Sequence, residues 1–576
     1  MEASQILVTG LLKREDTQYQ IPLYQRPYSW NDQQCEDLWR DVQEQADRKE
    51  EGGSHAPHFL GAIVLTPALN DQASFRRFLV VDGQQRLTTL SLALAALRDH
   101  CQARDPERAD RIEKQYLVNG YKSDDDRLRV LPTQVDRHVY RRIIIHRDVL
   151  DQQDRIIKAY HYFKEQFAKN ECSDDPIPIE DIEETITTRL SLVDVTADKN
   201  ENAHRIFESL NNKGQGLLQA DLIRNHVFMM LGSRADDVYD KDWKRVAAEA
   251  PDANDLEAIM WLKLVLDGDR DARRNDLYGA QQRWFERHGD TPESAVEYIR
   301  SLARLAPLYR LIREPDLEQS LEVRDGLKRL ETWKAGAAHP VVMVLLDARS
   351  RDEISSSEVA RGLVLIESFL VRRTFVSKTP SGLVRIFQSI PAQLAGREQQ
   401  NPVDCIHKLL SLSRRNWPND AQLRKAMRSQ PFFEKGGKAN EQRRFILSRI
   451  EESYGHPEPI DFATGKLTIE HVMPQSLTDE WRELLEDVES DESARETHQR
   501  LVHTIGNLTL SAENSKLGTK IFERKKVLFE SSHLEMNREI ANTNSWGENE
   551  ILSRADRLAD RAIKLWPAPI EDSEVV

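Results

Sequence analysis

The spacing of apolar residues changes along the chain and divides it into stretches of different predicted structure. Short β-branched and aromatic runs at 58–67 and 76–81 predict two strands of a small sheet. Apolar residues then recur at helical spacing, which predicts an amphipathic helix over 87–99. A third strand is predicted at 189–196, followed by a helix, an Asn/Gly turn and a second helix over 203–231.

The middle and end of the chain have a different pattern. Between about 231 and 430 the apolar periodicity is almost entirely helical, and no fixed-period repeat supports a solenoid. Short strands are predicted in "TIEHVMPQS" and "IGNLTL", and one more amphipathic helix closes the chain. The patterns therefore predict a helix-rich α+β protein with domains at 1–230, 231–430 and 431–576, the middle one a helical bundle.

Composition limits the classes of protein that fit. At 576 residues the chain is too long for one hydrophobic core. The net charge of −15 argues against a general nucleic-acid coat protein, but it leaves room for a nucleic-acid enzyme, whose phosphate contacts depend on local charge. The four cysteines form no CxxC pair, and no apolar run is long enough for a membrane span or a secretory signal. We therefore expect a cytoplasmic protein without a membrane partner.

The motif "TIEHVMPQS" places Glu470 and His471 side by side at a strand end, where Pro474 interrupts regular pairing. Asn507 follows in "IGNLTL", and Asn514 lies at the start of a predicted helix. A neutral imidazole can deprotonate water, while a carboxylate and an amide supply oxygen ligands for Mg²⁺. Each feature taken singly is more often a surface pair or a turn residue. The ordered set favours metal-assisted phosphodiester hydrolysis.

A second polar group lies near the N-terminus, in "IPLYQRPYSW" (21–30) and "VVDGQQRLTTL" (80–90). Gln85 and Arg86 fall where a predicted strand meets a helix N-terminus, a place that favours an anion. In the alternative interpretation Asp82 caps the helix and pairs with Arg86. Residue chemistry alone leaves the two interpretations evenly balanced, and for Tyr28 and Trp30 it favours core packing.

The C-terminal motifs resemble those of the HNH (ββα-metal) nucleases, and most closely the C-terminal domain of GmrSD-type restriction enzymes. The resemblance implies that His471 is the general base, that Glu470 and Asn514 are metal ligands, and that Asn507 ties the loop and orients the base. It implies Mg²⁺ or Mn²⁺ as the metal. His498 and His503 are weaker candidates. The basic run 515–526 is expected to face DNA phosphate through Lys516, Lys520 and Lys525.

"YQRPYSW", "DGQQR" and "FESLNNKGQGLLQADLIRN" occur in the order of the N-terminal domain of the same family, which is similar to the ParB/sulfiredoxin fold. The resemblance implies a site for a nucleoside triphosphate, GTP or ATP. Its predicted residues are Asp82, Gly83, Gln84, Gln85, Arg86, Tyr24, Gln25, Arg26 and Asn211, with Gly214 beside them. No Walker-type GxxxxGK[ST] is present, which excludes a P-loop ATPase.

Together the motifs predict an NTP-regulated DNA endonuclease of a prokaryotic anti-phage restriction system, with NTPase activity. Its partner would be double-stranded DNA, unmodified or modified, and two cuts for a double-strand break would favour a homodimer. The alternative is a nucleotide-dependent DNA-binding or scaffolding module with a degenerate nuclease site. The sequence offers no helix-turn-helix that would favour a partition protein.

Overall fold

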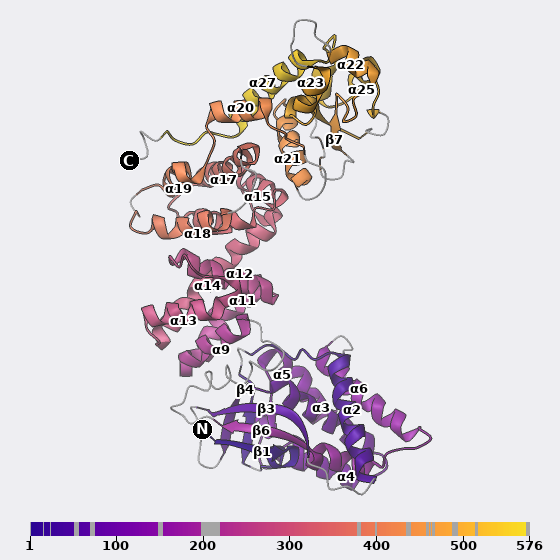
Figure 1. Ribbon diagram of the computed structural model, residues 1–576. Coiled ribbons are helices and arrows are strands. Elements are labelled where there is room, and N and C mark those ends of the chain that lie inside the picture. Colours follow the sequence, from indigo (N-terminus) through magenta and orange to yellow (C-terminus); the bar gives the residue numbers. More distant parts are fainter. Residues whose placement is uncertain are drawn as a thin grey trace. The chain divides into compact units, whose positions relative to one another are not determined.

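The structure is a computed structural model (Figure 1). It describes residues 2–571 except 15, 23–24, 51–56, 69–74, 148–153, 197–218, 377–381, 398–399, 434–438, 457–459, 461, 463–466, 486–492 and 513–516. The chain divides into two compact units, one formed by 1–257 with 275–303 and the other by 258–274 with 304–576. The predicted boundaries at 230 and 430 stay a prediction.

The first unit contains a mixed six-stranded sheet in the order β1-β6-β3-β4-β2-β5. Strand β3 pairs antiparallel with β4 and parallel with β6, while β2 lies parallel to both β4 and β5. The strands are β1 (Glu2–Leu7), β2 (Thr17–Gln20), β3 (His58–Pro67), β4 (Arg76–Asp82), β5 (Val130–Leu131) and β6 (Leu190–Thr196). The three strands expected from the sequence are therefore present as β3, β4 and β6.

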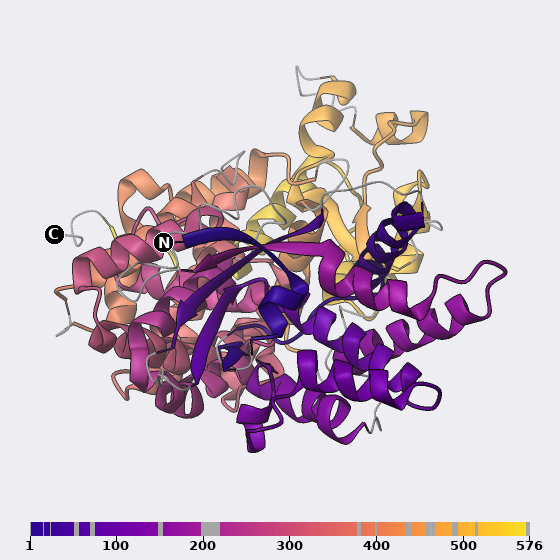
Figure 2. The same cartoon turned by 90° about the horizontal axis from the view of Figure 1, so that it is seen from below.

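Helices cover both faces of this sheet. Most of them contribute to the core on one face of the sheet, where the long helices among them are seen in Figures 1 and 2. They are α1 (Val8–Leu12), α2 (Asp32–Glu50), α3 (Gln84–Cys101), α4 (Pro106–Ile112), α5 (Gln134–Arg141), α6 (Arg155–Glu171) and α7 (Ile179–Glu184). On the other face Val64, Val81 and Val195 pack with Leu222 and Met229 of α9 (Gln219–Leu231). Alternate residues of one strand thus enter different cores.

Helix α3 differs from its predicted form. It begins at Gln84, three residues before the expected start, and it is buried on nearly all sides and not on one face. The reason is its position between the sheet and neighbouring helices, which is typical of a helix apolar all round. Gln84, Gln85 and Arg86 therefore lie in the first turn of a central helix and not in a connecting loop.

The described residues after α9 form helices and one small sheet. Residues 235–313 form α10 (Ala235–Val238), α11 (Lys244–Glu249), α12 (Ala253–Leu266), α13 (Leu277–His288) and α14 (Pro292–Arg313), of which α10, α11 and α13 belong to the first unit. The second unit continues with α15 (Leu321–Thr332), α16 (His339–Ser350), α17 (Ser356–Val376), α18 (Leu383–Leu394), α19 (Pro402–Ser411) and α20 (Asp420–Ser429). The helical periodicity between 231 and 430 is thus confirmed.

The C-terminal part of the second unit surrounds a two-stranded antiparallel sheet, β7 (Thr468–His471) with β8 (Leu508–Ser511). Around it lie α21 (Ala439–Glu452), α22 (Asp479–Leu485), α23 (Ala494–Leu501), α25 (Phe522–Glu530), α26 (Glu535–Ala541) and α27 (Glu548–Leu565). The helix-rich α+β class is confirmed. Along the described stretches, no helix combines the length and apolar character that crossing a bilayer requires.

Candidate functional site

The turn between β4 and α3 is built around Gly83. Asp82 ends the strand, Gly83 has φ +88°, and α3 begins at the next residue. A Cβ atom at Gly83 would lie 3.1 Å from the backbone oxygen of Ala62 and 3.2 Å from Cα of Ile63. Both the left-handed conformation and the close backbone approach require glycine, so this turn is fixed by the sequence.

Two glutamines hold the "QRPYSW" segment against this turn. The Gln85 side chain accepts a hydrogen bond from Ser29 N at 2.8 Å and donates to Pro27 O at 3.4 Å. Gln25 Nε2 donates to Val81 O at 3.1 Å, beside the end of β4. The structure therefore brings the two Gln-Arg pairs together, and both polar groups of Gln85 bind the protein backbone. Gln85 shapes the site, and its predicted contact with a nucleotide stays a prediction.

Gln84 is in a different situation from Gln85. Its side chain is 8% exposed, and Oε1 has no hydrogen-bond partner among the described residues. An unsatisfied buried amide oxygen is uncommon in folded proteins. Gln84 is thus a polar group that the described part of the protein does not satisfy.

Charged side chains surround Asp82. Burial raises the pKa of its carboxyl group, and this is opposed by Arg86, by the N–H of Gly83 and by Arg26. Arg26 also lies 4.0 Å from the buried carboxylate of Asp221, on α9. Asp221 belongs to the run "FESLNNKGQGLLQADLIRN" but was not predicted as a site residue. The pairing with Arg26 adds Asp221 to the polar residues of this region.

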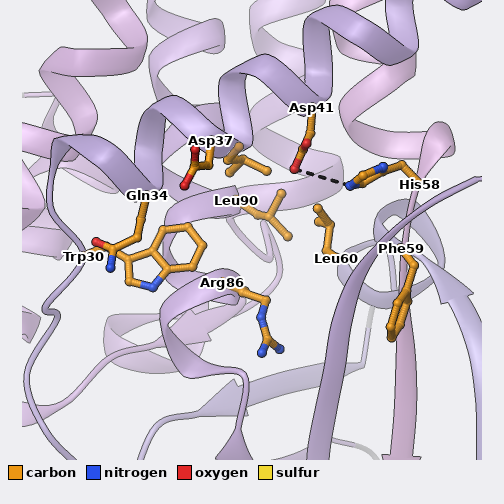
Figure 3. Close-up of a pocket in the computed structure, with 10 residues that line it drawn as sticks. Trp30, Gln34, Asp37, Asp41, His58, Phe59, Leu60, Arg86 and Leu90 are labelled. Atoms are coloured by element: carbon orange, nitrogen blue, oxygen red, sulfur yellow. Dashed lines mark ion pairs between the residues drawn. The ribbon is translucent and has the colours of Figure 1, made fainter. Parts of the chain in front are cut away.

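The Arg86 side chain lines a cavity of about 210 Å³ (Figure 3). Its guanidinium donates to Ala62 O. A Cβ atom on Gly61 would approach Arg86 Cζ to 2.9 Å, so the glycine leaves room for the arginine. Other residues that line the cavity are Trp30, Gln34, Asp37, Asp41 and His58.

The walls of this cavity combine aromatic, acidic and basic groups. Trp30 is half-buried and packs against the core while also facing the cavity, so core packing describes it only in part. His58 Nε2 lies 3.3 Å from Asp41 Oδ2. Asp37, Asp41 and His58 were not predicted from the sequence. The two acids lie on α2, which carries no motif and looks like a solvated helix face, and His58 is the first residue of β3. Two further predicted residues, Tyr24 and Asn211, lie outside the described residues, as does Gly214.

The second polar region is built on β7 and β8. Glu470 pairs with Thr509 and His471 with Leu508 in the antiparallel register. Helix α25 follows β8 and packs on the same strands, because Lys525 Nζ donates to the backbone oxygen of His471 at 2.8 Å. The region is therefore a strand–strand–helix arrangement, with Glu470 and His471 at the end of its first strand.

Asn507 joins the segment after β7 to the segment before β8, and it is fully buried. Its Oδ1 accepts from Met473 N at 2.7 Å and from Trp546 Nε1 at 3.1 Å. Its Nδ2 donates to Met473 O at 2.8 Å and to Val502 O at 2.9 Å. All four hydrogen-bonding positions of the amide are used, so Asn507 fixes the backbone next to His471 and does not itself face a substrate.

His471 is 5% exposed, and its ring has polar neighbours at both nitrogens. Nε2 lies 3.1 Å from His503 Nδ1, and Nδ1 lies 3.4 Å from Gln475 Nε2. Burial, followed by the charges of His503, Lys525 and His498, lowers the pKa of His471 to about 3. The imidazole is therefore neutral at pH 7 and keeps a lone pair that can accept a proton.

Glu470 is paired with Lys525, a residue that the sequence predicted to contact DNA. Lys525 Nζ donates to Glu470 Oε1 at 3.1 Å, and the lysine side chain is fully buried. The expected DNA contact of Lys525 is therefore wrong, because its ammonium faces the interior. Lys520 is exposed, as a DNA contact requires, whereas Lys516 and Asn514 lie outside the described residues.

Histidines near His471 divide into two kinds. His503, rated a weaker candidate, contacts the His471 ring directly. His498 is buried and donates from Nε2 to Pro474 O at 2.8 Å, which braces the chain after β7. In the sequence, only the position of His503 four residues before Asn507 indicated a role for it. The contact with His471 depends on the pairing of β7 with β8.

The described residues contain no group of three His, Cys, Asp or Glu side chains arranged to hold a metal ion. The carboxylate of Glu470 nevertheless forms an ion pair with the ammonium of Lys525. Mg²⁺ in nucleic-acid enzymes commonly uses one or two carboxylates together with waters and substrate phosphate. The donor chemistry of Glu470 thus fits a hard divalent cation.

The fold and the two polar regions define a multidomain α+β protein with one candidate site in each compact unit. Comparison with family models gives matches at both ends. The model described as "GmrSD restriction endonuclease, N-terminal domain" matches residues 8–228, and "GmrSD restriction endonucleases, C-terminal domain" matches residues 417–561. Together the two matches span more than half of the chain, which therefore belongs to the GmrSD restriction endonuclease family. A search of curated protein sequences found no match.

Proposed function

We propose that the protein is an NTP-regulated, metal-dependent DNA endonuclease of a prokaryotic anti-phage restriction system, cutting at an HNH-type site around His471. The observation that carries the proposal is the position of His471 next to Glu470 at the end of β7, with the following backbone braced by the buried amide of Asn507. Family membership supports the restriction-type nuclease.

His471 accepts a proton from the attacking water, and the resulting hydroxide attacks the phosphorus of the scissile phosphodiester. A positioned general base typically contributes about 10²- to 10⁴-fold in rate. Asn507 keeps His471 at the strand end through the Met473 backbone. Exposed Lys520 contributes local positive charge for DNA phosphate, although the whole chain is acidic.

Glu470, with Asn514, would hold Mg²⁺ or Mn²⁺. A bound divalent cation supplies electrostatic stabilisation of the charge that develops on the phosphate. Lys525 is the competing cation for Glu470 and balances the carboxylate in the protein alone. In the protein alone, the proposed site therefore consists of the imidazole of His471 at the end of β7 and the neighbouring carboxylate of Glu470, which is paired with Lys525.

The nucleotide part of the proposal rests on the other unit. Arg86, in the first turn of α3, borders a cavity whose wall includes the Trp30 indole. A guanidinium beside a helix N-terminus suits a phosphate, and an aromatic face suits a nucleobase. GTP or ATP bound there would regulate cleavage, in a monomer or a homodimer acting on modified or unmodified DNA.

The test is cleavage of plasmid DNA by the full chain with Mg²⁺ or Mn²⁺, with and without NTP. We expect His471→Ala to abolish cleavage while the protein still folds. His533→Ala, an exposed histidine in the same unit, is the matched control and should cut normally. A His471→Ala protein that still cuts would overturn the nuclease proposal and leave the binding or scaffolding module as the better account.

A further inference from the structure

The two edges of the His471 ring differ in how firmly they are held. The Nε2 edge contacts His503 Nδ1 at 3.1 Å. Among the described residues, the hydrogen-bond partner of the Nδ1 edge is the exposed side chain of Gln475, at the long distance of 3.4 Å. A bond of that length is weak, so the Nδ1 edge can exchange Gln475 for water at little cost.

The contact with Gln475 favours one position for the imidazole proton. An amide nitrogen donates and cannot accept, so His471 Nδ1 is the acceptor in this contact. This contact favours the tautomer with the proton on Nε2, in which the N–H donates to His503 Nδ1. In this tautomer the lone pair of His471 lies on Nδ1, which faces the exposed side chain of Gln475.

His503 is itself held in place. Its backbone oxygen accepts from Phe432 N at 2.7 Å and from Phe433 N at 3.1 Å. The Phe433 ring stacks on His503 with centroids 5.8 Å apart, and its plane is nearly perpendicular to the His471 ring at 4.7 Å. The imidazole of His503 thus has a fixed orientation toward His471.

We propose that His503 is a positioning residue that fixes the tautomer and orientation of His471, so that Nδ1 is the atom that takes the proton from water. This inference rests on the proposed nuclease function and names the atom that acts. His503 acts through its contact with the ring of His471.

The O–H bond of water breaks, its proton goes to His471 Nδ1, and the imidazolium keeps its Nε2–H bond to His503. The hydroxide oxygen bonds to phosphorus, the ester P–O bond breaks, and the leaving oxygen takes a proton from solvent. His471 then returns its proton to solvent. Without an acceptor at Nε2, the proton would also populate Nδ1 and block the basic lone pair.

The test compares His503→Asn with His503→Leu in the full chain. The two side chains have nearly the same shape, but the Asn Oδ1 can accept a hydrogen bond near the place of Nδ1, and Leu cannot. We expect the Leu variant to lose about 10- to 100-fold in kcat with KM for plasmid DNA unchanged, as is typical for a residue that orients a catalytic histidine. The Asn variant should recover most of the loss.

Thermal unfolding establishes that both variants fold. If the Leu variant unfolds, His503→Phe replaces it, because phenylalanine keeps the stacking on Phe433 without the acceptor. Leu or Phe variants that cut within about twofold of the Asn variant overturn the inference. Such a result together with an inactive His471→Ala variant contradicts only the role of His503. An active His471→Ala variant contradicts the proposed nuclease function as well.

Discussion

The ammonium of Lys525 and the carboxylate of Glu470 form a buried ion pair at 3.1 Å, with Lys525 completely shielded from solvent. Burial raises the pKa of Glu470 and lowers that of Lys525, and each is opposed by the charge of the other. The same ammonium binds the backbone oxygen of His471. One lysine on α25 therefore joins the candidate metal ligand to the strand that carries the candidate base.

This pair predicts a large effect on stability. Lys525→Met should lower the free energy of unfolding by about 3–5 kcal/mol, because it leaves a buried carboxylate without its counter-charge. The double variant Glu470→Gln with Lys525→Met should lose less, since it removes both charges. Urea unfolding followed by circular dichroism measures both. Equal losses in the single and double variants would show that the pair itself contributes nothing.

Arg86 should govern nucleotide binding and leave the nuclease fold intact. Loss of a charge-assisted contact to phosphate costs about 1.5–3 kcal/mol, so Arg86→Ala should weaken NTP binding by about 10- to 100-fold. Titration calorimetry with GTP and ATP measures the change, and exposed Arg76 on β4 provides the control variant Arg76→Ala. Unchanged binding and NTP hydrolysis in Arg86→Ala would rule out the nucleotide site at this turn.

His339 at the start of α16 should make stability depend on pH. Its Nδ1 is buried without a hydrogen-bond partner among the described residues, and burial, together with the charge of Arg274, lowers the pKa to about 4. Between the unfolded value of about 6.5 and this folded value, only the unfolded state binds the proton. Stability contributed by the neutral histidine is therefore complete above about pH 6.5 and declines as the pH falls toward 4.

The expected slope from this one group is at most about 1.4 kcal/mol per pH unit. His339→Phe should remove this part of the acid sensitivity. Urea unfolding of the wild type and the variant at pH 7, 6 and 5 gives the difference directly. A wild-type minus variant difference that stays constant over this range would contradict the assignment.

The sequence by itself determined the secondary structure where a local physical cause fixes it. The β-branched runs form β3, β4 and β6. The turn between β4 and α3 needs glycine at position 83, because φ is positive there. The order of the motifs also indicated the family. These features depend on neighbouring residues, whose spacing and conformational limits are visible in one dimension.

Tertiary structure decided the partners. Lys525 looked like a DNA contact because a basic run is usually solvated, yet α25 turns it toward Glu470, fifty-five residues earlier. His503 became significant only through its contact with His471. The sequence does not show why residue 506 is glycine. In the structure, a Cβ atom at Gly506 would lie 2.3 Å from the backbone oxygen of Ile551 on α27. Charge pairing, ring contacts and backbone approach depend on distances in space, which the pairing of β7 with β8 and the packing of helices set.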